Sequence, residues 1–152
     1  MTTTPQDPYL AGLTDAPSYD REFQGKQVIA KVVSVYDGDT ITAIFRLNPA
    51  SPALKYSVRL TGIDTPEMKP LKTVPNREAL IALAKSARDF IITRTTVQLV
   101  MLDLQGLDKY GRVLARVYLT PTPDPAHCIN DMLIQAGLAK PYAGGSKSTW
   151  SV

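Results

Sequence analysis

The sequence is short of the residues on which several kinds of site depend. Its 152 residues include one cysteine, Cys128, and one histidine, His127. A single cysteine excludes an internal disulfide and a cysteine-rich zinc site. A single histidine excludes acid–base catalysis by a histidine pair. The chain also has no glycine-rich phosphate loop and no serine-elbow motif, so it lacks the signatures of P-loop and α/β-hydrolase enzymes.

Long apolar runs are missing as well. No run reaches the ~18 residues that a membrane span requires, although apolar residues make up 44% of the chain, an ordinary proportion for a globular protein. The first residues lack the basic and apolar segments of a signal peptide, which favours a cytoplasmic protein, although a mature secreted form would look the same. We therefore expect one domain with no membrane partner.

Charge is unevenly distributed along the chain. Residues 1–25 have a net charge of −3, from one basic and four acidic residues: Arg21, Asp7, Asp15, Asp20 and Glu22. The rest of the chain, 26–152, contains 16 of the 17 basic and 10 of the 14 acidic residues, a net charge of +6. A basic body is typical of proteins that bind a polyanion such as nucleic acid. The alternative is that the charge has no such role, because many soluble domains of similar charge bind no nucleic acid.

The spacing of apolar residues predicts five strands and two helices. The expected strands are 28–36, 40–45, 55–63, 97–102 and 113–119, with a hairpin at Asp37-Gly38 and a turn at 106–111. The expected helices are 77–91, capped by Asn76, and 129–136, ended by Gly137.

This pattern predicts a fold class and the boundaries of the domain. Residues 1–25 are rich in Thr, Pro, Asp and Gly and predict an N-terminal arm. Residues 26–143 would form the domain, and 144–152 a C-terminal tail. The predicted class is α+β, mainly β: a five-stranded OB-fold barrel with a helix after the third strand and a short helix near the C-terminus. Periodicity alone fits a generic α+β domain equally well.

Three short motifs contain the residues for chemistry on a phosphodiester. They are Asp37-Gly38-Asp39-Thr40, Arg59-Leu60-Thr61-Gly62-Ile63-Asp64-Thr65-Pro66-Glu67 and Asp108-Lys109-Tyr110-Gly111-Arg112. Alone, the first motif indicates a type I′ hairpin turn. A closed barrel could also bring Asp39 and Asp64 together, and paired carboxylates are costly unless a cation neutralises them. Ligands that are all oxygen point to calcium or magnesium.

The second and third motifs add a spare carboxylate and two guanidinium groups. Glu67 lies three residues beyond Asp64, where it is either an exposed loop charge or a general base for water. Arg59 and Arg112 are expected on strand faces opposite the core. There they are either solvated or line a groove and bind phosphate oxygens through paired hydrogen bonds.

The order and spacing of these motifs resemble the staphylococcal nuclease (thermonuclease) family over roughly residues 27–142, where Gly137-Leu138-Ala139-Lys140 matches a further stretch. The resemblance implies the same barrel and a calcium-dependent endonuclease. Such an enzyme would cut DNA and RNA with low base specificity, favour single strands and leave 3′-phosphates. By resemblance, one calcium ion is bound by Asp39, Asp64 and the Thr65 carbonyl; Arg59, Glu67 and Arg112 are catalytic; and Lys109, Tyr110 and Tyr142 contact the substrate.

Two other functions stay open. One is a non-catalytic OB module that binds single-stranded nucleic acid. Degenerate domains of this kind tend to lose the carboxylates, whereas this sequence keeps all five side chains: Asp39, Arg59, Asp64, Glu67 and Arg112. The other is an interaction domain whose basic face contacts an acidic protein. We expect a monomer without the third, C-terminal helix of a secreted family member. The surface left bare would be covered by apolar residues of the arm: Tyr9, Leu10, Leu13, Tyr19 and Phe23.

Overall fold

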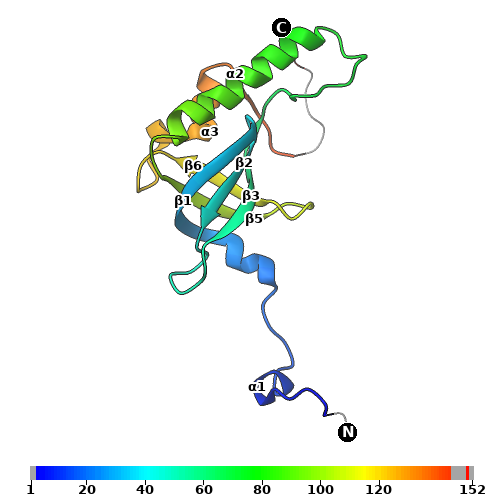
Figure 1. The fold of residues 1–152 in the computed structure, drawn as a ribbon, viewed down its shortest axis with the longest axis vertical. Helices are drawn as coiled ribbons and strands as arrows, with labels where there is room; N and C mark the ends of the chain where they lie inside the picture. Colours follow the sequence, from blue (N-terminus) through cyan, green and yellow to red (C-terminus); the bar gives the residue numbers. More distant parts are fainter. Residues whose placement is uncertain (1–2, 145–149, 151–152) are drawn as a thin grey trace.

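The computed structural model describes residues 3–144 and 150, and its centre is a closed β-barrel (Figure 1). The strands follow the order β1-β2-β3-β6-β5, and β5 pairs back onto β1. Neighbours are antiparallel except β3 and β6, which run parallel. The bounds are β1 Gln24–Asp37, β2 Thr40–Phe45, β3 Leu54–Leu60, β5 Val100–Leu107 and β6 Val113–Tyr118. The predicted fold class, a mainly β five-stranded OB-type barrel, is confirmed.

The long helix α2, Arg77–Thr95, lies across one end of the barrel in Figure 1. It begins after Asn76, whose backbone is left-handed (φ 57°). Its buried stripe repeats at helical spacing, as expected of a helix with one face on a core: Leu80, Ala84, Ala87, Ile91 and Thr95. Together with the inward faces of the strands it closes the main core. None of the helices in the described part of the chain has the length and apolarity needed to cross a bilayer.

The short helix α3, Ile129–Gln135, is fastened to the barrel by a buried amide. Asn130 is fully buried; its Oδ1 accepts a hydrogen bond from the backbone N of Val117 (3.0 Å), and its Nδ2 donates to the Thr61 carbonyl (2.9 Å). A buried amide that lost these partners would be costly. Asn130 therefore fixes both α3 and the end of β3. The 3-10 turn η2, Pro125–His127, precedes this helix.

A second, two-stranded sheet was not predicted. β4, Ile63–Asp64, pairs antiparallel with β7, Lys140–Pro141. The predicted strand 55–63 therefore breaks after Leu60, where Gly62 adopts a positive φ of 76°. This break turns Asp64 away from the line of β3.

Two further details differ from the predictions. The strand expected at 97–102 starts at Val100 and continues to Leu107, because α2 extends to Thr95 and leaves Val97 and Leu99 exposed. The β1–β2 hairpin is present, but neither Gly38 nor Asp39 has a positive φ, so its turn is not type I′. A register irregularity in β1 just before Asp37 accompanies the different turn.

The arm does not cover the barrel. It contains a helical turn, α1 Pro8–Ala11, and a 3-10 helix, η1 Tyr19–Phe23. Phe23 packs edge-on against Tyr56, with ring centres 5.9 Å apart. The other four apolar residues expected to cover the barrel are exposed, so that expectation is wrong for them: Tyr9, Leu10, Leu13 and Tyr19. Figure 1 shows the arm leaving from the end of the barrel opposite α2. Of the expected tail 144–152, residues 145–149 and 151–152 lie outside the described residues.

Candidate functional site

The β1–β2 hairpin places the first acidic residue at the α2 end of the barrel. Asp39 is buried; its Oδ1 accepts a hydrogen bond from Thr40 Oγ1 (3.2 Å), and its Oδ2 accepts one from the backbone N of Thr65 (3.3 Å). Gly38 permits this approach, because a Cβ there would lie 2.7 Å from both the Ala87 Cβ and the Thr65 Cγ2. The structure thus brings together Asp39 and the loop that begins at Asp64, as the sequence suggested.

Arg59 is buried rather than solvated, with 8% of its surface exposed. Its Nη1 donates to the Leu60 carbonyl (2.6 Å) and its Nη2 to the Ile63 carbonyl (2.9 Å). The same Nη2 lies 3.6 Å from Asp39 Oδ2. The alternative of a solvated side chain is therefore wrong for Arg59. Its guanidinium is held in one orientation, and because arginine has five N–H donors, some remain for a ligand.

Arg112 is held by a different set of partners. Its Nε donates to Asp108 Oδ2 (2.7 Å) and its Nη1 to Thr40 Oγ1 (3.3 Å). Thr40 also donates to Asp39 and faces Arg59 across the β2–β3 register. Thr40 therefore links the two arginines through one hydroxyl group and one carboxylate.

The Asp108 carboxylate shapes the turn that presents Arg112. It accepts hydrogen bonds from the backbone N of Tyr110 and of Arg112, each 2.9 Å long, and Gly111 closes the turn with a φ of 81°. Partial burial acts to raise the pKa of Asp108, but these hydrogen bonds and the Arg112 charge outweigh it and lower the pKa overall. Asp108 thus stays ionised and keeps Arg112 in place.

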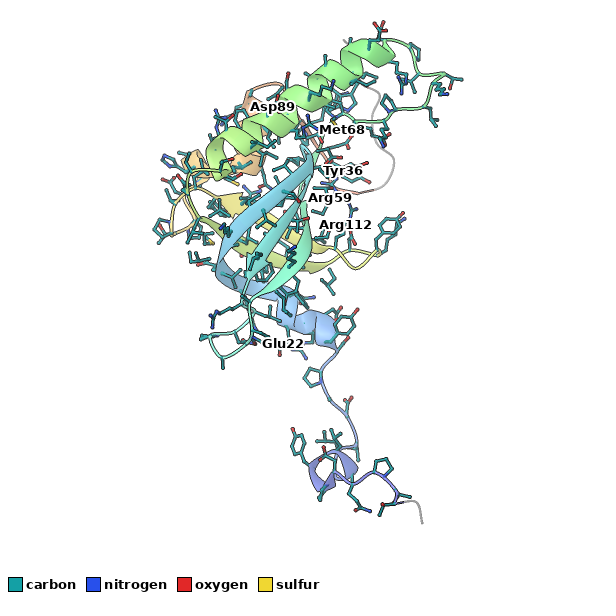
Figure 2. The ribbon with its side chains drawn as sticks, viewed as in Figure 1. Glu22, Tyr36, Arg59, Met68, Asp89 and Arg112 are labelled. Carbon is teal, nitrogen blue, oxygen red and sulfur yellow. The ribbon has the colours of Figure 1, made fainter. Side chains whose placement is uncertain are left out.

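Both arginines line one cavity of ≈670 Å³, together with the three residues expected to contact substrate: Lys109, Tyr110 and Tyr142. Figure 2 shows Arg59 and Arg112 in the same region of the barrel, far from Glu22 at the root of the arm. The Tyr110 ring is exposed, with the Lys109 Nζ 5.1 Å from its centre. The cavity therefore combines fixed cations with an accessible aromatic face.

Glu67 lies in a separate, smaller cavity of ≈250 Å³, which Asp64 and Thr65 also line. Asp64 and Thr65 are buried, whereas Glu67 is exposed. The two cavities meet at β4, because Arg59 of the larger cavity bonds the carbonyl of Ile63, the residue before Asp64. The structure thus places Glu67 beside the acidic residues and not within the arginine cavity.

The oxygen atoms at this junction fit a hard divalent cation. Burial, a hydrogen bond to Asp39 and the Asp39 charge raise the pKa of Asp37 to about 7. Two neighbouring carboxyl groups of which one has so high a pKa are a pair that a cation can neutralise. Thr65 Oγ1 is also buried without a hydrogen-bond partner in the described structure.

The donor set is nevertheless small. Among residues 3–144 and 150, no three acidic, histidine or cysteine side chains converge to form a ready-made metal site. The oxygens that the sequence predicts as ligands are the Asp39 and Asp64 carboxylates and the Thr65 carbonyl, with the Asp37 carboxyl and Thr65 Oγ1 next to them in the chain or the fold. Calcium, which takes six to eight oxygen ligands, would need water and substrate oxygens as well. The residues therefore fit a cation that is bound together with a phosphate rather than one enclosed by protein.

Three residues of the motifs support the site in ways that sequence reasoning did not predict: Asp37, Thr40 and Asp108. Asp108 carries a recognisable signal, since an aspartate before a tight turn commonly accepts backbone hydrogen bonds two residues on. The link through Thr40 had no such signal, because it depends on which strands become neighbours.

Comparison with protein families gives an independent result. Residues 57–149 match the family model described as staphylococcal nuclease homologue, a match over 93 of the 152 residues. It includes Arg59, Asp64, Glu67 and Arg112, and begins after Asp39. A search of curated proteins found no match.

Proposed function

Because the chain belongs to the staphylococcal nuclease family, we propose that it is a calcium-dependent endonuclease that hydrolyses the phosphodiester bonds of DNA and RNA. The observation that carries this proposal is the convergence on one cavity, beside the buried Asp39, of Arg59 from β3 and Arg112 from the turn between β5 and β6, not from a strand face as expected. A solvated basic face would not require this buried network. Fixed guanidinium groups next to a carboxylate suit an anion that gains charge during the reaction.

The two arginines would bind the scissile phosphate. Arg59 already donates to two backbone carbonyls, and Arg112 to Asp108 and Thr40, so neither must be reoriented when substrate arrives. Their remaining N–H groups would donate to the non-bridging oxygens, most strongly once phosphorus becomes five-coordinate. Arg112, with 30% of its side chain exposed against 10% for Arg59, would make the first contact with substrate.

Asp39, Asp64 and the Thr65 carbonyl would hold one calcium ion, which when bound polarises a phosphoryl oxygen and lowers the pKa of coordinated water. Glu67 would accept a proton from the attacking water. A glutamate with an ordinary pKa of ~4.3 is a weak base at neutral pH, so its contribution depends on its position beside Asp64 and Thr65.

The walls of the arginine cavity support low base specificity. Tyr110 and Tyr142 would stack on bases, an interaction worth about 1–3 kcal/mol per base that tolerates any sequence. Lys109 would attract the neighbouring phosphates. Stacking requires bases that can be splayed out, so single strands would be favoured. Products ending in 3′-phosphates are the outcome that the family resemblance implies.

Degradation of denatured DNA tests the proposal. The wild type should cut in calcium and stop in a calcium chelator, and Glu67→Gln should cut about 10²–10⁴-fold more slowly. Glu78→Gln, an exposed glutamate in the first turn of α2, is the matched control and should cut normally. Degradation that persists in the chelator, or equally in Glu67→Gln, would contradict the proposal. Calcium-independent binding of single-stranded DNA without cleavage would instead identify the non-catalytic OB module.

A further inference from the structure

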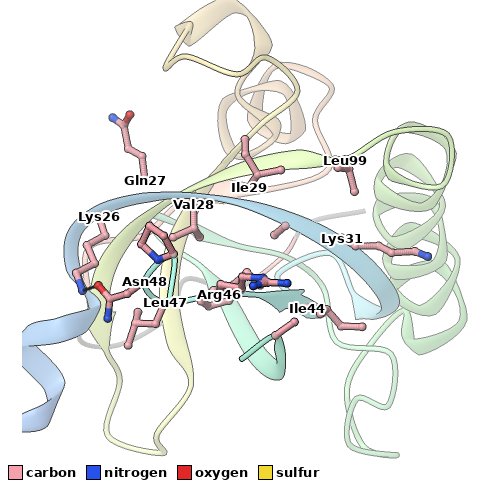
Figure 3. Close-up of a pocket in the computed structure, with 14 residues that line it drawn as sticks. Lys26, Gln27, Val28, Ile29, Lys31, Ile44, Arg46, Leu47, Asn48 and Leu99 are labelled. Atoms are coloured by element: carbon pink, nitrogen blue, oxygen red, sulfur yellow. Dashed lines mark hydrogen bonds between the residues drawn. The ribbon is translucent and has the colours of Figure 1, made fainter. Parts of the chain in front are cut away.

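The arm and the outer side of the barrel are both unpartnered, and their charges are opposite. We propose that the arm of one molecule docks into the β1–β2 groove of a second copy of this chain, so that two copies form a dimer by exchanging arms. The β1–β2 groove is defined here as the cavity of ≈640 Å³ along the outside of β1 and β2 (Figure 3).

The strand register explains why this face points outward. Ala30 pairs with Phe45, and both are buried in the core. Side chains alternate across a strand, so the neighbours of these two residues face out and line the groove: Ile29, Lys31, Ile44 and Arg46. Ile29 is 52% exposed and Leu99, at the edge of the groove, is 56% exposed. The groove is therefore an apolar floor open to solvent.

The charged residues that line the groove are all basic: Lys26, Lys31 and Arg46. In the view of Figure 3, Lys26 and Lys31 lie at opposite ends, with Arg46 between them. Lys26 pairs with Glu22 at 2.6 Å. Within the described residues, Lys31 and Arg46 have no carboxylate within ion-pair distance. The groove thus has unpaired positive charge on an apolar surface.

The arm has the complementary features. The Asp7 side chain caps α1 by accepting a hydrogen bond from the backbone N of Leu10 (3.1 Å), and Pro8 starts the turn. This ordered turn exposes Tyr9 and Leu10, which are 74% and 59% accessible. Two adjacent apolar side chains held in water by this turn are available for burial by a partner. The net charge of −3 over residues 1–25 matches a basic groove.

The placement of the arm favours a second copy over its own barrel. η1 is fastened by the Phe23–Tyr56 contact and the Glu22–Lys26 ion pair, so the root of the arm adjoins the Lys26 end of the groove. From there the arm leads away from the barrel and α1 stands clear of it (Figure 1). Two copies related by a twofold axis near their roots would each offer a groove to the other's arm. A dimer of this kind is the alternative to the monomer that the sequence predicts, and the experiment below decides between them.

Sedimentation velocity of the full chain over a range of concentrations tests this. We expect a species of twice 16.6 kDa that dissociates as salt is raised. Leu10→Asp in the arm and Lys31→Glu/Arg46→Glu in the groove should each weaken association by about tenfold or more. Lys85→Glu, an exposed lysine of α2, is the matched control and should associate like the wild type.

A charge exchange separates docking from general damage. Asp15→Lys/Asp20→Lys reverses charges of the arm, and this variant and the groove variant should each be monomeric alone. Mixed together, they should form a dimer, because both arm–groove pairs are then of opposite charge. A wild type of 16.6 kDa at every concentration, a dimer that survives Leu10→Asp, or a mixture that stays monomeric would each overturn the proposal.

Discussion

The arginine cavity and the β1–β2 groove are both basic, yet they hold their charges in different ways. Arg59 and Arg112 are tied to backbone carbonyls, to Thr40 and to Asp108. Lys31 and Arg46 have no such partners among the described residues. Positive charge in either place attracts a polyanion. Only donors that are already oriented stabilise a transition state without reorganisation. The two regions should therefore attract nucleic acid to a similar extent but differ strongly in their effect on kcat.

The largest expected effect comes from truncating the fixed arginines. Arg59→Ala and Arg112→Ala should each lower kcat on single-stranded DNA by about 10²–10³-fold, the usual loss for one preorganised donor. Lys31→Ala and Arg46→Ala should change kcat by less than about threefold, because they would act only on long-range attraction. Steady-state kinetics at low and high salt checks this. If both pairs of variants lost kcat equally, the claim that only the fixed arginines act in catalysis would be wrong.

The close approach of the hairpin gives the next largest effect. Gly38→Ala should destabilise the fold by about 1–3 kcal/mol, because the added Cβ would collide with Ala87 and Thr65. It should also lower activity, since it displaces Asp39 from the Thr65 backbone. Denaturant unfolding measures the change. Gly12→Ala in the arm, where a Cβ meets only ordinary contacts, should leave stability unchanged. A stable and fully active Gly38→Ala would show that the hairpin does not position the site.

Removing the Asp108 charge tests how Arg112 is held. Asp108→Asn weakens the bond to Arg112 Nε, so we expect about a tenfold loss of kcat with little change in stability. Asp124→Asn, at another aspartate whose side chain accepts a hydrogen bond from a backbone N two residues on, is the control and should keep full activity. Wild-type kcat in Asp108→Asn would mean that substrate alone orients Arg112.

The sequence predicted the barrel and helices well where local patterns decide the structure. The apolar spacing that begins at Leu80 identified α2, and the β-branched runs around Asp37-Gly38 identified the hairpin. Alternation also placed Arg59 on the face opposite Val58. It could not show that the β4 turn and Asp39 would cover that face, because both come from other parts of the chain.

The other differences between the predicted and the observed structure also depend on contacts between distant parts of the chain. β4 and β7 have two residues each and one includes Pro141, so no periodic signal marks them. The apolar residues of the arm suggested burial on the barrel, whereas Tyr9 and Leu10 point into solvent. Composition shows only that these side chains are apolar. Which surface they can reach depends on the direction in which η1 leads the arm, and the sequence does not show that direction.

The smallest expected effect is on stability as a function of pH. The Asp37 pKa of about 7 in the fold exceeds its ordinary value of 3.8. Between these two pKa values the folded state therefore holds a proton that the unfolded state has lost, so stability falls as pH rises from 3.8 to about 7 and is level above that. After burial, the hydrogen bond to Asp39 and the Asp39 charge are the next largest causes of this shift.

In a calcium chelator, Asp37→Asn should therefore match the wild type in Tm at about pH 3, where the carboxyl is protonated in both states, and exceed it at about pH 8. Asp15→Asn in the exposed arm is the control and should show no such difference. A Tm advantage of Asp37→Asn that is the same at both pH values would mean that the fold does not raise the pKa of Asp37.

A crystal structure with calcium and a short single-stranded oligonucleotide carrying a non-hydrolysable linkage tests the central claim most directly. We predict one phosphate in contact with both Arg59 and Arg112, and an ion bound by Asp39 and Asp64 beside it. A phosphate backbone that lies instead along Lys31 and Arg46, with no ion at Asp39, would contradict the assignment of the catalytic site.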